Sequence, residues 1–284
     1  MNDAAYTRNR RLISSTGCEK MHSTVLSCPK SLALDRSKQQ LYTGTLSGKV
    51  YCCSLVQSDD SSSQALPDPQ VLHSFDGGRP LGMRLSSDGT VLYFIEASSG
   101  LYAYHLQRKE CRHLLGRCSL ILISKPLHGY QPLLSLPLIA LFALALHCLL
   151  LSTDLADTRF LDGRPSKFFD DLAVDEQGGG ENGTPVIYLT DVSRKFAVDM
   201  WVYTYLEPDS SGRILRYDLA TGVCSVVLEN LCFPNGIEVT EGGRSLLICE
   251  LSKRRILQHQ LKGPSAGLTT VFIDNLPGEP ENVR

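Results

Sequence analysis

The sequence lacks an excess of charge of either sign. It has 28 Lys and Arg residues against 30 Asp and Glu residues, so its formal net charge is −2. Nucleic-acid binding requires a basic surface that neutralises phosphates, and the basic run at residues 8–11 is too short to supply one. The composition therefore predicts no nucleic-acid partner.

Familiar catalytic motifs are also missing. There is no Gly-x-Ser-x-Gly elbow, no P-loop and no His-Glu-x-x-His pair, which are the signatures of α/β-hydrolases, phosphate-binding loops and zinc peptidases. The seven His residues are scattered along the chain. These motifs therefore assign no catalytic residue.

Cysteine is plentiful, but its spacing does not predict a metal site. No Cys-x-x-Cys pair occurs among the ten Cys residues, and Cys52 and Cys53 are adjacent. Others lie in apolar runs, as Cys224 and Cys249 do, where buried free thiols are common. The redox compartment stays open. The sequon that begins at Asn182, in a Gly-rich loop, predicts a glycoprotein, although the Pro that follows it weakens this signal.

Residues 1–20 are polar and lack the apolar stretch of a signal peptide. We interpret them as an N-terminal tail. Either the protein is cytosolic, or its natural N-terminus lies upstream of this sequence.

One long apolar run breaks the ordinary composition. Leu133 to Leu151 is interrupted only by Ser135, Pro137 and His147, and it has the length and composition of a membrane-spanning helix. Basic residues precede it and acidic residues follow it, so the positive-inside rule places its N-terminal flank in the cytoplasm. The run predicts membrane association, at the endoplasmic reticulum or the plasma membrane.

Outside this run the chain consists of short apolar segments separated by turns. Val91–Ile95 follows the turn Ser87–Gly89, and Gly100–Tyr104 comes next. Segments of four to six residues at intervals near ten are typical of an all-β fold. Helical periodicity does not compete with this pattern elsewhere.

The expected strands group into a larger repeat. A motif of polar or small residues precedes the first strand of each group, and it recurs about every 50 residues once the apolar insertion is left out, which is typical of β-propeller blades. The motif occurs at Pro29–Ser31, Arg79–Gly82, Phe169–Leu172, Pro234–Gly236 and Pro280–Asn282.

The repeat predicts an all-β propeller over residues 21–284, with about four blades and the start of a fifth. Because such a set leaves an unpaired edge, we expect the complete fold to be longer than this sequence. Residues 117–165 interrupt it as an apolar helical insertion, and a spanning helix there would separate the blades. Three interpretations stay open: a hairpin anchor in one face of a membrane, a buried apolar insertion, or translated intron from an erroneous gene model.

The repeat also predicts a metal site. In a propeller, the residue that begins each innermost strand faces the central channel, so Asp170, Asn235, Glu281 and Asn282 should converge on one axis. Carboxylate and amide oxygens from separate loops suit calcium, because calcium accepts irregular shells of oxygen ligands. The alternative is that each residue only shapes a turn or caps local backbone groups.

Taken in series, these motifs resemble the strictosidine-synthase-like family over most of the chain, except residues 1–20 and about 117–165. The resemblance implies a six-bladed propeller with calcium in the channel, arylesterase-type hydrolysis of a small ester or lactone, and an N-terminal signal anchor. It rests on Tyr42–Thr45, Gly48–Val50, Gly78–Gly82, Phe169–Leu172, Tyr188–Ser193, Gly212–Asp218, Leu231–Gly236 and Leu276–Arg284.

Several positions depart from the family pattern. Lys30 stands where the family has an acidic ligand, and its charge opposes a metal ion. Asp170 and Glu281 keep an oxygen ligand but change its charge or reach. Leu81 replaces the His that serves lactonase-type members as a general base. The Glu that serves plant strictosidine synthases belongs to a later blade, so we do not expect the alkaloid-forming condensation.

Two functions stay open at this point. The first is a calcium-dependent hydrolase of the arylesterase type. The second is a non-catalytic propeller, membrane-associated or secreted, that binds partners through its loops. Leu81 and Lys30 favour the second function, whereas the retained oxygen ligands favour the first.

Overall fold

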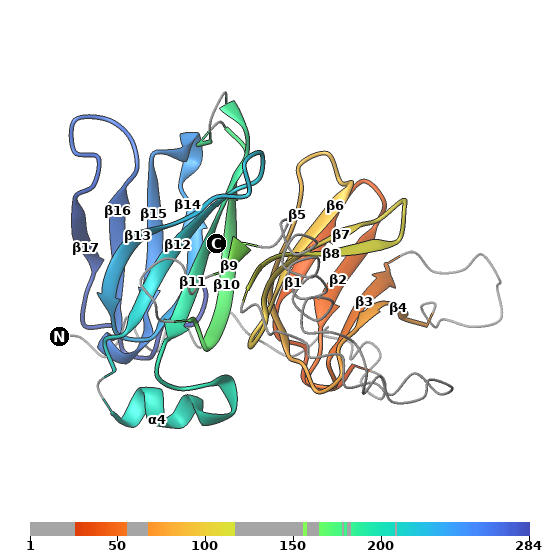
Figure 1. Ribbon diagram of the computed structural model, residues 1–284, viewed down its shortest axis with the longest axis horizontal. Helices are drawn as coiled ribbons and strands as arrows, with labels where there is room; N and C mark the ends of the chain where they lie inside the picture. Colours follow the sequence, from red (N-terminus) through yellow and green to blue (C-terminus); the bar gives the residue numbers. More distant parts are fainter. Residues whose placement is uncertain are drawn as a thin grey trace, which may run out of the picture.

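The computed structural model describes residues 26–55, 68–116, 156–157, 165–177, 179–180, 183–207 and 209–284. Within these ranges the chain forms four β-sheets of consecutive strands, which pair antiparallel except for one short parallel strand at the end of the second sheet. The sheets follow one another as blades, and the C-terminus lies near the middle of the molecule beside β10 (Figure 1). The predicted all-β propeller architecture is confirmed.

Each blade uses its strands in chain order. The first blade consists of β1 (Leu32–Asp35), β2 (Gln40–Gly44), β3 (Lys49–Ser54) and β4 (Gln70–Ser74). The second consists of β5 (Pro80–Leu85), β6 (Val91–Glu96), β7 (Gly100–His105), β8 (Glu110–Gly116) and β9 (Ala156–Asp157). The third consists of β10 (Phe168–Asp175), β11 (Val186–Ser193), β12 (Gly212–Asp218) and β13 (Cys224–Leu231). The fourth consists of β14 (Pro234–Val239), β15 (Ser245–Glu250), β16 (Arg255–Gln260) and β17 (Thr269–Ile273).

Aspartate side chains close the hairpins between strands. After β12, Asp218 Oδ1 accepts hydrogen bonds from the backbone N–H groups of Ala220 and Thr221, at 3.0 and 3.1 Å. Gly222 completes this turn with φ +69°, a conformation that glycine adopts without steric cost. Asp35 makes the equivalent bonds after β1, 3.0 Å from the N–H groups of Ser37 and Lys38. The Asp and Gly punctuation therefore sets where strands end.

The core lies between the blades. Ala33, Val50, Met83 and Phe94 belong to a cluster that joins the first two blades. A second cluster joins the second and third blades, and a third joins the third and fourth. Because the blades bury their faces against each other, the apolar residues on each strand fix both the sheet and its neighbour.

One helical connection crosses an end of the third blade (Figure 1). Between β11 and β12, the 3-10 helix η3 (Val198–Met200) leads into α4 (Trp201–Leu206). Most of the α4 side chains are exposed, with Thr204 as its buried residue. Two further 3-10 turns, η4 (Glu241–Gly243) and η5 (Leu251–Lys253), flank β15.

Several predictions of the sequence fall outside the described residues. They are the tail 1–20, the apolar run Leu133–Leu151 and the sequon residue Asn182. Of the predicted insertion 117–165, the structure describes Ala156, Asp157 and Pro165, and the first two form β9, which pairs in parallel with β8. No helix in the described part of the chain is long and apolar enough to cross a bilayer. The seven cysteines described there are free thiols.

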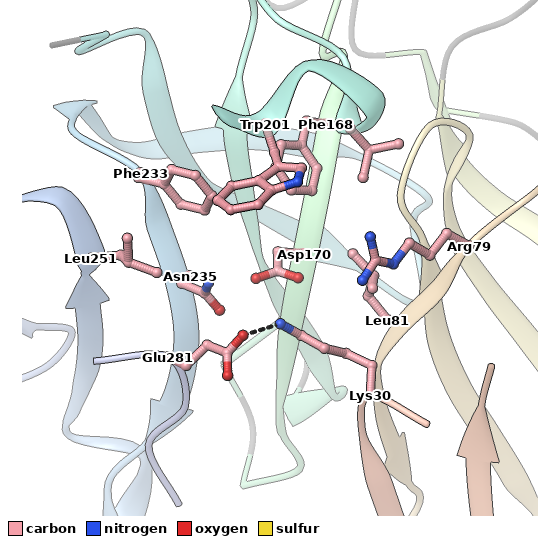
Figure 2. A pocket seen from close by; sticks show the side chains of 11 residues that line it. Lys30, Arg79, Leu81, Phe168, Asp170, Trp201, Phe233, Asn235, Leu251 and Glu281 are labelled. Carbon is pink, nitrogen blue, oxygen red and sulfur yellow. Dashed lines mark hydrogen bonds and ion pairs between the residues drawn. The ribbon is translucent and has the colours of Figure 1, made fainter. Parts of the chain in front are cut away.

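The same irregularity recurs in three inner strands. In β10 the pairing with β11 shifts between Phe169 and Leu172, so Asp170 and Asp171 both stand opposite Thr190. Strands β5 and β14 shift at the matching places, between Pro80 and Met83 and between Pro234 and Ile237. A bulge of this kind re-aims side chains. Figure 2 shows the side chains at the first position inside each shift, Leu81, Asp170 and Asn235, turned toward one shared space.

Glycine occupies the second bulge position where two inner strands nearly touch. A Cβ atom at Gly82 would lie 2.6 Å from the Cα atom of Asp171, and one at Gly236 would lie 2.6 Å from the Cα atom of Asn282. No real side chain tolerates such distances. The glycines of the repeated motif therefore serve the close approach of neighbouring blades.

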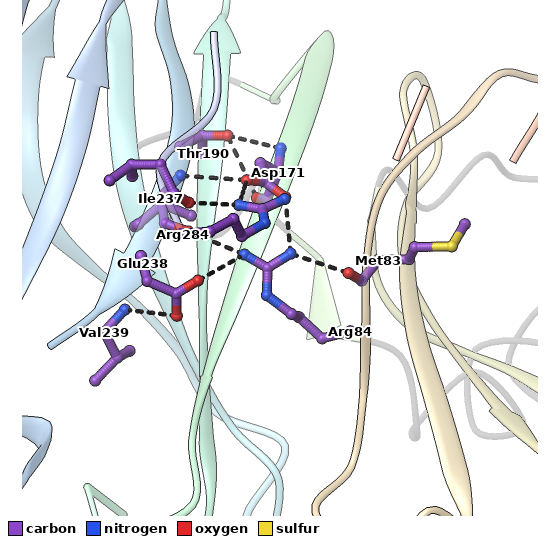
Figure 3. Close-up of polar contacts among 9 residues, drawn as sticks. Met83, Arg84, Asp171, Thr190, Ile237, Glu238, Val239 and Arg284 are labelled. Carbon is purple, nitrogen blue, oxygen red and sulfur yellow. Dashed lines mark hydrogen bonds and ion pairs between the residues drawn. The ribbon is translucent and has the colours of Figure 1, made fainter. Parts of the chain in front are cut away.

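Asp171 holds three blades together. Its buried carboxylate accepts hydrogen bonds from Arg284, at 2.9 Å, and from the backbone N–H of Ile237 in β14, at 3.3 Å. Arg84 of β5 lies 3.5 Å from the same carboxylate and donates to Glu238 of β14 at 3.1 Å (Figure 3). Burial lowers the pKa of Arg84, and the charge of Asp171 opposes that shift. Charged side chains thus link β5, β10, β14 and the C-terminal residue.

The substitution Asp171→Ala should destabilise the fold by about 2–4 kcal/mol, because it leaves the largely buried Arg84 and the buried N–H of Ile237 without their carboxylate. Urea unfolding followed by circular dichroism measures this loss. Asp68→Ala removes an exposed carboxylate and serves as the control, with an expected change below about 0.5 kcal/mol. Equal effects of the two substitutions would show that Asp171 does not join the blades.

Candidate functional site

The inner strands enclose a cavity of about 190 Å³ at the end of the molecule that carries α4. Its wall combines polar and charged side chains with apolar ones (Figure 2). It is lined by Lys30, Arg79, Leu81, Phe168, Asp170, Val198, Trp201, Phe233, Asn235, Leu251 and Glu281.

Five of these residues occupy the same position of the repeated motif. In the five repeats, this position lies directly before Ser31, Gly82, Asp171, Gly236 and Asn282. They come from five successive repeats: Lys30, Leu81, Asp170, Asn235 and Glu281. At Leu81, Asp170 and Asn235 a bulge turns this position toward the channel. The repeat seen in the sequence therefore becomes a ring of side chains around one space.

The structure brings together three of the four predicted ligand residues. Asp170, Asn235 and Glu281 line the cavity, but Asn282 does not belong to its wall. Asn282 occupies the next motif position, is exposed, and packs its backbone against Gly236. Their assignment as metal ligands stays a prediction.

Asp170 is the buried acid of the site. Its side chain is 3% exposed, and burial raises its pKa to about 7. The negative charges of Asp171 and Glu281 raise the pKa further, whereas Lys30 and Arg79 lower it. A carboxyl group with this pKa exchanges its proton near neutral pH, which suits general acid–base chemistry.

Asn235 presents an unsatisfied acceptor. The residue is 3% exposed, and its Oδ1 atom has no hydrogen-bond partner among the residues that the structure describes. A buried amide oxygen without a partner costs about 1–3 kcal/mol, and such a cost is typical of binding sites rather than of cores. This oxygen is therefore available to a ligand.

Two cations share the cavity with these acceptors. The Lys30 ammonium group forms an ion pair with the Glu281 carboxylate (Figure 2). Arg79 lines the same wall, close enough to lower the pKa of Asp170. With Asp170 and Glu281 both ionised, the two positive charges balance the two negative ones.

Aromatic side chains form the opposite part of the wall (Figure 2). Phe168 and Phe233 meet edge to face with their centroids 5.8 Å apart, and Leu81 packs in the same buried cluster. Trp201 comes from α4 and is 47% exposed, so it stands at the cavity mouth. An aromatic ring of a small ligand would bury its apolar surface here.

The donor set does not fit a calcium ion while Lys30 lies in it. Calcium takes six to eight oxygen ligands, and the cavity supplies the oxygens of Asp170 and Asn235 and those of Glu281, which Lys30 already occupies. An ammonium group about 4 Å from a divalent ion repels it by several kcal/mol, even at an effective dielectric constant of about 20. No cluster of three His, Cys, Asp or Glu side chains with metal-site geometry occurs among the described residues.

Sequence reasoning missed three features of this cavity. Arg79 was a motif residue without a role, Trp201 had no predicted role, and Lys30 had no predicted partner. The repeat could have predicted that Lys30 lines the cavity, since Lys30 occupies the same motif position as Asp170. Nothing in the sequence could have brought α4 over the cavity, because that contact depends on tertiary packing.

Comparisons with known proteins agree with the motif pattern. The strictosidine synthase family model matches residues 170–264. The adipocyte plasma membrane-associated protein of Danio rerio is 28% identical over 272 residues, which are 94% of this chain and 52% of that protein. Protein strictosidine synthase-like 13 of Arabidopsis thaliana is 29% identical over 272 residues, which are 90% of this chain and 55% of that protein. The chain thus spans about half the length of these relatives.

Solved structures resemble this fold at low sequence identity. A structure in a nidogen/laminin complex superposes with a TM-score of 0.53 and 14% identity, covering 89% of this chain and 67% of that one. Regucalcin from Agrobacterium tumefaciens, a calcium-binding protein, gives a TM-score of 0.49 at 11% identity, covering 89% of this chain and 61% of that one. The first likeness supports the propeller fold. The sequence matches confirm the resemblance that the motifs predicted: this chain is a relative of the strictosidine synthase-like proteins and of the adipocyte plasma membrane-associated proteins.

Proposed function

We propose that the cavity is an active site for hydrolysis of small aryl esters, in keeping with the arylesterase-type activity expected from the family resemblance. One observation carries the proposal: an aromatic wall faces a buried carboxyl group that two cationic side chains flank. An aryl ester matches this arrangement, because its ring is apolar and its carbonyl oxygen becomes negative during hydrolysis.

Asp170 acts as the general base in this proposal. Its carboxylate takes a proton from a water molecule, whose oxygen forms a bond to the ester carbonyl carbon. The carbonyl oxygen becomes an oxyanion, and the bond from that carbon to the aryl oxygen then breaks. The departing aryl oxide takes the proton from Asp170, which restores the carboxylate. This scheme replaces the base that Leu81 cannot supply.

Lys30 and Arg79 stabilise the oxyanion. Both side chains line the cavity, and both carry a positive charge at neutral pH. Donors fixed in place before the reaction stabilise a developing negative charge more than water does, because they need no reorganisation. Phe168, Phe233 and Trp201 hold the aryl ring, and their apolar surfaces keep bulk water from the reacting bond.

The alternative is a non-catalytic propeller that binds a partner through its loops. The exposed apolar side chains around α4 favour this function. They are Met200, Trp201, Val202, Tyr203, Tyr205 and Leu206, with exposed fractions from 41% to 70%. If no ester is hydrolysed, this surface becomes the first place to look for a binding partner.

Hydrolysis of phenyl acetate tests the proposed reaction. Asp170→Asn removes the base at nearly constant volume and should lower kcat/KM at least about 100-fold. In the unmodified protein the rate should rise with pH through about 7, where Asp170 loses its proton. Asp175→Asn makes the same change on the same strand, outside the cavity, and should leave the rate within about 2-fold. Equal rates for both variants would remove Asp170 from the mechanism.

The raised pKa of Asp170 also predicts how stability depends on pH. Between about pH 4 and pH 7 the folded protein keeps a proton that the unfolded chain releases, so the stability falls as pH rises through this window. Asp170→Asn avoids this penalty. At pH 8 its free energy of unfolding should be higher than that of the unmodified protein, by on the order of 2–4 kcal/mol. Urea unfolding should show a smaller gain at pH 5. A gain independent of pH would mean that Asp170 is not held protonated by burial.

We also propose that the protein associates with a membrane, as the names of its animal relatives describe for them. The apolar run Leu133–Leu151 is the expected contact. In cell fractionation the full chain should stay in the membrane pellet after carbonate washing, and a variant without residues 133–151 should move to the supernatant. Release of the full chain by the same wash would contradict the proposal.

A further inference from the structure

One of the five cavity residues that share a motif position is positively charged. Lys30 is the cation among the five residues that share this position, and the others are Leu81, Asp170, Asn235 and Glu281. Its side chain enters the space between Asp170 and Glu281 (Figure 2). The Lys30 ammonium group pairs with Glu281 and lowers the pKa of Asp170.

We propose that the Lys30 ammonium group takes the place of a metal ion in this cavity and makes it a metal-independent site. A cation between acidic and amide oxygens offsets their repulsion whether it is a calcium ion or an ammonium group. Lysine brings this charge on the polypeptide itself, so the oxygens of Asp170 and Glu281 are neutralised without a bound metal. The inference rests on the cavity of the proposed function and assigns the positive charge in it.

The neighbouring carboxylate cannot restore a metal site. Asp171 follows Asp170, but Arg284 and Arg84 lie 2.9 Å and 3.5 Å from its oxygens, and the N–H of Ile237 donates to it. Its charge is therefore used in joining the blades. The side-chain ligands left for a metal ion in the cavity would be the Asp170 carboxylate, the Asn235 amide oxygen and the part of the Glu281 carboxylate that is not paired with Lys30.

The same arrangement leaves the Asn235 oxygen for the organic ligand. This oxygen is buried and has no hydrogen-bond partner in the described part of the chain, and no metal is needed to satisfy it if the ligand brings a donor. A small aromatic ligand with a hydroxyl or N–H group fits this place, with its ring against Phe168 and Phe233. The carbonyl oxygen of such a ligand would face Lys30.

Calcium binding by variants of the whole chain tests the proposal. Isothermal titration with calcium chloride and thermal unfolding with 1 mM calcium or with chelator are the two measurements. The unmodified protein should bind no calcium at this site and show the same Tm in both buffers. Lys30→Glu adds a third carboxylate to the cavity and should gain one calcium site and a Tm rise of at least about 3 °C with calcium.

Controls separate the role of Lys30 from a general effect of charge. Lys49→Glu makes the same substitution on the same blade outside the cavity and should gain no calcium site. Lys30→Arg keeps the positive charge and should also bind no calcium. If Lys30→Glu does not fold, Lys30→Gln frees Glu281 without adding charge and should gain weaker binding, with a smaller rise in Tm.

Two results would overturn the proposal: calcium binding by the unmodified protein that Asp170→Asn abolishes, or no calcium binding by folded Lys30→Glu and Lys30→Gln. These readouts do not use turnover, so they are independent of the ester hydrolysis proposed above. A protein that gains calcium through Lys30→Glu but never hydrolyses phenyl acetate would contradict only the proposed function.

Discussion

The carboxylate of Asp171 is the contact on which the arrangement of the blades depends. It lies where β5, β10 and β14 come closest, and Arg84, Arg284 and the backbone of Ile237 all bind it. A buried carboxylate is costly unless it is paired. Because its partners come from different blades, the pairing is satisfied only when the blades take their places around the channel. The glycines at the neighbouring motif positions permit this approach.

The bulge on β10 places two adjacent acids in different surroundings. Asp171 turns toward the arginines that join the blades, and Asp170 turns toward the cavity. The first acid is compensated by close partners, whereas burial raises the pKa of the second to about 7. One irregularity in strand pairing therefore supplies both a rigid support and a group that can exchange a proton. The rigid support also holds Asp170 and Asn235 in fixed positions relative to each other.

Charge balance gives the cavity its chemical character. Its two acids and two cations sum to zero when all are ionised, and one of the cations, Lys30, enters at a position that holds acids or amides in three other repeats. The aromatic wall opposite lowers the local polarity, which strengthens each electrostatic contact. The sequence resemblance does not by itself assign an activity, because activity follows from the particular side chains of the ring.

The sequence by itself determined the all-β blades, since the short apolar segments, the Asp and Gly turns and the period near 50 residues are local properties of the chain. It also determined that Lys30, Leu81, Asp170, Asn235 and Glu281 share one position of the repeat, although Asn282, which it placed in the channel as well, does not belong to the cavity wall. Only the tertiary structure decided what these residues do. The pairing of Lys30 with Glu281 joins positions 251 residues apart, the bulges separate Asp170 from Asp171, and packing brings Trp201 to the cavity mouth. These relations depend on distances between blades, which no local pattern encodes.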